Sequence, residues 1–249
     1  MGGAAPVLSR RRALALVALL AALVVYGAGA GVLPDVSNAW DVAFAAAVLL
    51  PATLCVVLVA LPAARWRGTV WAGLGLVALS VVLRVAGLES LFNVTKLLAL
   101  TSFGFAFVTL LEPPLGLVVS LAAIIPWVDA YSVWRGPTKV VVTEHPGLFD
   151  RISIAFRTPG ENSTANLGPP DVVFFAIFLA TAQQFRLRVG WTFVGMVAFL
   201  VVTLVATASF DLSGLPALPA ISLGFLLPNA DLLWHRWREW RVSQAERAG

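Results

Sequence analysis

The chain has 249 residues, of which 59% are apolar and only 12% are charged, and its formal net charge is +4. Soluble domains contain roughly 25% charged residues, so this composition excludes an ordinary soluble domain and indicates a protein that crosses a membrane several times. The cations lie at the ends of apolar segments, where they face anionic lipid headgroups, so we predict the lipid bilayer and no nucleic acid as a partner.

Eight apolar segments approach the ~20 residues that a helix needs to span hydrocarbon. They are residues 13–32, 41–62, 69–87, 91–111, 114–134, 170–185, 189–209 and 215–234. Backbone groups cannot stay unpaired in lipid, and these segments are continuously apolar, which favours helices over a β-barrel. We therefore predict an all-α, polytopic transmembrane helical bundle of about eight spans. Arg84, Glu89 and Lys96 interrupt the third and fourth segments, so the count could be seven to nine.

The first segment follows Arg10, Arg11 and Arg12 and ends in a run of small residues, Gly27 to Ala30. This pattern fits a secretory signal or a retained first helix, and its length favours the retained helix. With eight spans, the basic clusters near residues 10–12, 65–67, 186–188 and 236–247 share one side. The positive-inside rule makes that side the cytoplasm. We predict an integral protein of the plasma membrane with both termini cytoplasmic.

Residues 135–169 form the longest segment that is not apolar, and they separate the fifth and sixth predicted spans. β-Branched runs at 138–143 and 151–156 flank His145-Pro146-Gly147, which predicts a small β-hairpin with a long turn. Residues 158–164 read as a flexible linker. The loop is therefore the candidate gate to a site at this end of the bundle.

Asp129 lies inside the fifth predicted span, and Asp171 lies at the start of the sixth. An acid at bilayer depth costs roughly 2.5–3.5 kcal/mol, so such residues are functional candidates. Asp129 could instead form an ion pair with Arg84 or Lys96. Asp171 could be an ordinary first-turn acid, because Pro169 and Pro170 are typical of a helix start. Connectivity brings both carboxyl groups toward one leaflet, where they could face each other.

Other catalytic chemistries have little support in the sequence. The single cysteine, Cys55, lies within a predicted span, so no disulfide and no thiolate metal site is expected. His145 and His235 are the only histidines, and neither has a neighbouring cluster of metal ligands or a serine partner. We predict no metal and no cofactor.

Three motifs resemble the presenilin and signal peptide peptidase family of intramembrane aspartyl proteases. That family has Tyr-Asp on one helix, Gly-x-Gly-Asp on the next and Pro-Ala-Leu on the last. This chain has Val128-Asp129, Gly168-Pro169-Pro170-Asp171 and Pro216-Ala217-Leu218, followed by Pro219. The similarity covers about the C-terminal half, from Pro126 onward, and the first four spans match only in hydrophobicity. We therefore divide the chain into N-terminal helices, residues 1–112, and a presenilin-like catalytic half, residues 113–249. We treat residues 1–249 as one integral membrane domain.

The resemblance implies an intramembrane aspartic endopeptidase of the GxGD type, with Asp129 and Asp171 as the catalytic pair. It implies that Gly168 and the segment Pro216, Ala217, Leu218 and Pro219 bind substrate beside them. The substrates would be transmembrane helices or signal-peptide-like helices, and accessory subunits stay open. Two positions depart from the family: Val128 replaces its tyrosine, and Pro170 replaces the glycine before the second aspartate, which puts activity in doubt.

Two other functions stay open. A family member that has lost catalysis could act as a membrane binding protein or chaperone, which Val128 and Pro170 favour. A proton-coupled transporter could use the aspartates as a relay, and inverted repeats would distinguish it, but the sequence shows no repeat.

Overall fold

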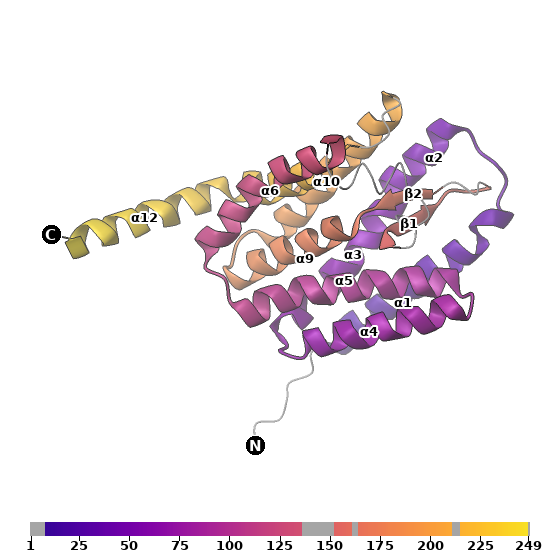
Figure 1. Cartoon of the computed structure of the whole chain (residues 1–249), viewed down its shortest axis with the longest axis horizontal. Helices are drawn as coiled ribbons and strands as arrows, with labels where there is room; N and C mark the ends of the chain where they lie inside the picture. The colour runs from indigo at the N-terminus through magenta and orange to yellow at the C-terminus, as the bar shows by residue number, and fades with distance from the viewer. Residues whose placement is uncertain (1–7, 136–151, 161–163, 211–214, 249) are drawn as a thin grey trace, which may run out of the picture.

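The computed structural model describes residues 8–135, 152–160, 164–210 and 215–248. Within these ranges the chain is a helical bundle with one two-stranded ribbon, as predicted (Figure 1). The first half contains α1 (Arg10–Gly29), α2 (Asn38–Phe44), η2 (Ala45–Leu49), α3 (Leu50–Ala60), η3 (Leu61–Arg65), α4 (Thr69–Val85) and α5 (Glu89–Leu111). The second half contains α6 (Leu115–Arg135), α9 (Pro169–Gln184), α10 (Val189–Ser209), α11 (Leu218–Leu226), η4 (Leu227–Asn229) and α12 (Ala230–Ala248).

Several of these helices are long and apolar enough to cross a membrane, which supports an integral membrane protein. Among the described residues there are five, spanning 10–32, 38–65, 89–111, 115–135 and 189–209, and α4 is a shorter apolar helix. The helices follow the predicted apolar segments closely, except that the last segment divides into α11, η4 and a long α12. The count of eight spans stays a prediction.

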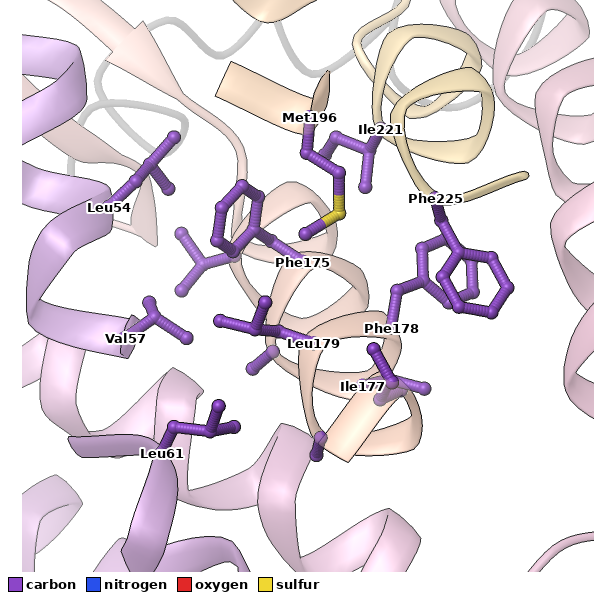
Figure 2. Packing of buried hydrophobic residues seen from close by; sticks show 14 of the residues in the cluster. Leu54, Val57, Leu61, Phe175, Ile177, Phe178, Leu179, Met196, Ile221 and Phe225 are labelled. Atoms are coloured by element: carbon purple, nitrogen blue, oxygen red, sulfur yellow. The ribbon is translucent and has the colours of Figure 1, made fainter. Parts of the chain in front are cut away.

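Helix α9 lies at the centre of the bundle. From Phe175 to Ala182 every side chain is buried, so α9 has no polar face, as expected for a helix surrounded by others. Figure 2 shows Phe175 and Leu179 between Leu54 and Val57 of α3 on one side and Met196 of α10 on the other. The rings of Phe178 and Phe225 stack with centroids 4.8 Å apart, which joins α9 to α11. Dense packing therefore fixes the helix that carries Asp171.

A buried amide joins α10 to η4. The Asn229 side chain is fully buried, and its Nδ2 donates to Thr192 Oγ1 at 2.7 Å and to the Phe225 carbonyl at 2.8 Å. Its Oδ1 accepts from the Arg188 backbone N–H at 3.0 Å. The amide nitrogen and the amide oxygen both have partners, so Asn229 can be buried without the cost of an unpaired amide.

Asn229→Ala should therefore lower the free energy of unfolding by about 2–4 kcal/mol, because it leaves the Thr192 hydroxyl and the Arg188 N–H without their partner. Reversible unfolding in mixed detergent micelles measures this change. Asn38→Ala is the matched control, since Asn38 is exposed at the start of α2 and should change stability little. Equal stability of the two variants would contradict the role of the network.

The two-stranded ribbon is confirmed, but its strands are not the predicted pair. Strand β1 (Ile154–Arg157) falls in the predicted run at 151–156, and it pairs antiparallel with β2 (Thr164–Leu167). The predicted partner, residues 138–143, lies outside the described residues. Thr164 was assigned to a flexible linker, and this was wrong, because it pairs with Arg157 at the start of β2. The pairing matters for the site, since β2 leads directly into α9.

Candidate active site at the start of α9

Asp129 lies in the second half of α6, after Pro126, and its side chain is half-buried. Its Oδ2 accepts a hydrogen bond from the backbone N–H of Leu218 at 3.0 Å. Leu218 is the first residue of α11, which packs along α6, and the first backbone N–H groups of a helix have no partner within it. The α11 start therefore offers Asp129 a donor that the helix itself does not use.

Asp171 lies in the first turn of α9 and is also half-buried. Its Oδ2 accepts the Gly168 N–H at 3.0 Å, and its own N–H donates to the Gly168 carbonyl at 3.1 Å. Pro169 and Pro170 occupy the first helical positions, where a backbone N–H would have no helical partner. Pro170 therefore fits this helix start, and Asp171 caps the helix as the ordinary first-turn interpretation expected.

Asp129 and Asp171 are carried by two helices that meet at this end of the bundle. Helices α6 and α9 are in contact, and α11 packs against both. The structure therefore gathers Asp129, Asp171 and the Leu218 backbone at one end of the bundle. In the described part of the chain, no cluster of three or more metal-ligating side chains is present.

The segment predicted to bind substrate lies beside Asp129, but its members differ in exposure. Pro216, Ala217 and Pro219 are half-buried, whereas Leu218 is only 3% exposed and packs in the core. Leu218 therefore contributes its backbone N–H to the site, and its side chain anchors the start of α11. Gly168 precedes α9, where its N–H binds Asp171.

The alternative ion pairs for Asp129 are not formed in the structure. Arg84 pairs with Glu89, five residues along the chain. Lys96 donates to the Ser153 carbonyl and lies over the Phe92 ring, with Nζ 4.4 Å from the ring centroid. Within the described residues both cations thus have partners away from Asp129. The Asp129 carboxylate is instead bound by the backbone N–H of Leu218.

Side chains of α1 and α5 hold the outer edge of β1, a role that was not predicted from the sequence. Asn93 binds both backbone groups of Ala155. Asn93 Nδ2 donates to the Ala155 carbonyl at 2.7 Å, and the Ala155 N–H donates to Asn93 Oδ1 at 3.0 Å. The Tyr26 hydroxyl donates to the Arg157 carbonyl at 2.8 Å, and Lys96 holds Ser153 as described above. The carbonyls of Ala155 and Arg157 in β1, and that of Ser153 just before it, therefore all have side-chain partners. The available signal was the helical spacing of Asn93 and Lys96 within an apolar segment.

Asn93→Ala should increase hydrogen exchange at the Ala155 amide by about tenfold, because the variant removes the acceptor for that N–H. Exchange measured by mass spectrometry on a peptide covering β1 tests this result. Ser102→Ala is the control in the same helix, since among the described residues the Ser102 hydroxyl bonds only to the Leu98 carbonyl of α5. Unchanged exchange in Asn93→Ala would show that α5 does not hold the strand.

A third acid, Asp41, was also not identified from the sequence. It lies in the first turn of α2 and is only 4% exposed, near Tyr26. It lies at the first residue of the second predicted span, where acids are common in the first turn of a helix. The structure buries Asp41 beside α1, whose Tyr26 holds the ribbon.

Comparison of the chain with protein-family models, with curated proteins and with solved structures finds no match.

Proposed function

We propose that this protein is an intramembrane aspartic endopeptidase that cleaves single-span or signal-peptide-like helices. The observation that carries the proposal is that α6 and α9, which bear Asp129 and Asp171, are in contact with each other and with α11 at one end of an apolar bundle. Their order with the Pro216-Ala217-Leu218 segment, which resembles the presenilin and signal peptide peptidase family, supports the same reading. The direct hydrogen bond between that segment and Asp129 adds a contact the sequence did not reveal.

Two adjacent carboxylates in a medium of low dielectric constant repel each other, so the pair would hold one proton between them. The ionised member takes a proton from water as the water oxygen attacks the peptide carbonyl carbon. The protonated member donates a hydrogen bond to the developing oxyanion and the pair then protonates the leaving nitrogen. Cleavage of the C–N bond yields a carboxylic acid and an amine, and no other reactant is needed.

A helical substrate must unwind before cleavage, and its freed backbone groups then need partners. Strand addition to the ribbon would supply them. The outer edge of β1 is held by Asn93, Tyr26 and Lys96, so a substrate strand would pair on the β2 side. Strand β2 continues through Gly168 to Asp171, so this side leads to the carboxyl pair. This refines the sequence-based hypothesis, in which the β1 run itself accepted substrate.

The test is cleavage of a panel of tagged single-span substrates by the purified protein in liposomes. We expect wild-type protein to release two fragments and the double variant Asp129→Ala/Asp171→Ala to release none. Absence of cleavage by wild-type protein, together with gain of cleavage by Pro170→Gly, would identify a family member that has lost activity. Absence of cleavage by both would refute the protease proposal and favour the binding or transport alternatives.

A further inference from the structure

A pocket of about 280 Å³ with a mixed polar and apolar lining lies at the end of the bundle opposite the carboxyl pair. It is formed where η3, α5 and α9 end, and its polar lining residues are Arg65, Arg67, Thr109, Glu112, Gln183 and Gln184. Gln183 follows Asp171 by twelve residues along α9, which is ~18 Å at 1.5 Å per residue. The pocket is therefore separate from the proposed active site.

The charges in this pocket are not balanced. Arg67 Nη2 lies 3.5 Å from Glu112 Oε1, and both side chains are mostly exposed, so this pair is weak. Within the described residues Arg65 has no ion-pair partner. Two guanidinium groups and one carboxylate leave a net charge of +1, which one phosphodiester would neutralise.

Gln183, one of the residues that line the pocket, has an acceptor that the described residues do not satisfy. The Oε1 atom of Gln183 is buried and has no hydrogen-bond donor among the described residues. A buried acceptor without a donor costs free energy, so a ligand that brings a hydroxyl or ammonium group would gain from binding there. The ligand should therefore carry a donor beyond its anionic group.

The surroundings of the pocket place it at the boundary between lipid and water. Trp66, between the two arginines, is 47% exposed, and tryptophan is enriched at the headgroup level of membranes. Leu110 and Leu111, which precede Glu112, are 52% and 65% exposed. Exposed leucines beside paired arginines suit a molecule with an acyl chain next to its anionic group, and the basic clusters place this end at the cytoplasmic leaflet.

We propose that this pocket binds the headgroup of an anionic glycerophospholipid that carries a free hydroxyl group, of the phosphatidylglycerol type. Arg65 and Arg67 hold the phosphodiester, and Gln183 Oε1 accepts a hydrogen bond from a headgroup hydroxyl. The acyl chains lie along the apolar surface at Leu110 and Leu111. The bound lipid would thereby join η3 to the ends of α5 and α9. This proposal does not depend on proteolytic activity.

Native mass spectrometry of the full chain in detergent tests the proposal, with phosphatidylglycerol and phosphatidylcholine as probes. We expect one phosphatidylglycerol to bind more tightly than phosphatidylcholine. Arg65→Ala/Arg67→Ala should weaken phosphatidylglycerol binding about thirtyfold, since each arginine near an anionic lipid contributes roughly fivefold. Arg11→Ala/Arg12→Ala removes the same charge from the same predicted side, outside the pocket, and should change binding less than twofold.

Gln183→Leu keeps the charge and nearly the volume, so it tests the hydroxyl contact without the arginines. It should weaken phosphatidylglycerol about fivefold and leave phosphatidylcholine unchanged. Inorganic phosphate at millimolar concentration should not displace the lipid, and displacement would show that the site binds free phosphate instead. Equal binding of the two lipids, or an equal loss in the Arg11→Ala/Arg12→Ala control, would overturn the proposal.

Discussion

Asp171→Asn is expected to abolish cleavage of a single-span substrate while the protein keeps its fold, and Asp129→Asn is expected to do the same. An asparagine oxygen still accepts the Gly168 N–H at residue 171 and the Leu218 N–H at residue 129. The amide cannot exchange a proton as a carboxyl group does, and general acid–base catalysis contributes about 10²- to 10⁴-fold in rate. Single-turnover cleavage in liposomes measures the loss.

Asp171→Ala separates the catalytic role from helix capping. This variant also loses the hydrogen bond from the Gly168 N–H, so its free energy of unfolding should fall by about 1 kcal/mol. Asp171→Asn keeps an acceptor for that N–H, so its free energy of unfolding should stay close to that of the wild-type protein. Asp231→Asn is the matched control, because Asp231 pairs with Arg188 at the other end of the bundle. Full activity in Asp171→Asn with reduced stability in Asp171→Ala would show that Asp171 is only a helix cap.

Hydropathy alone predicted the positions of most helices, because a helix surrounded by lipid or by other helices has apolar residues on every side. The same signal does not show which helix is central: the α9 segment is shorter and less purely apolar than several others, yet the structure buries Phe175 to Ala182 completely. Centrality depends on which helices pack together, and a single hydropathy profile contains no information on pairing.

The candidate site was predicted in its acids but not in its hydrogen bonds. Asp129 and Asp171 stand out because a carboxyl group is costly within an apolar segment. The contact from Leu218 joins residues 89 positions apart through a backbone N–H, and a backbone group leaves no mark on the sequence. The ribbon shows the same limit: the β-branched run at 151–156 predicted β1, whereas β2, which contains Asn166, has no such run, and only its first residue, Thr164, fell in the predicted linker.

Gly104→Ala is expected to destabilise the bundle and to slow cleavage, because α9 packs directly against Gly104 of α5. A Cβ at residue 104 would lie 2.6 Å from the Ala176 Cβ and 2.7 Å from the Val173 carbonyl oxygen. The second atom belongs to the backbone, so no side-chain rotation relieves the overlap, and α9 must shift as a unit. Overpacking of this kind costs about 1–3 kcal/mol.

Gly75→Ala in α4 provides the control, since a Cβ there meets no atom within 4 Å. That change should leave stability unchanged or raise it by up to about 1 kcal/mol, because alanine favours a helix over glycine. In Gly104→Ala both the free energy of unfolding, measured in mixed micelles, and the cleavage rate should fall. In Gly75→Ala neither should fall. Loss of stability without loss of rate would mean that α9 can shift while Asp171 keeps its distance to Asp129. Loss of both stability and cleavage rate, in contrast, is expected if the close α5–α9 contact sets the position of the Asp171 carboxyl group.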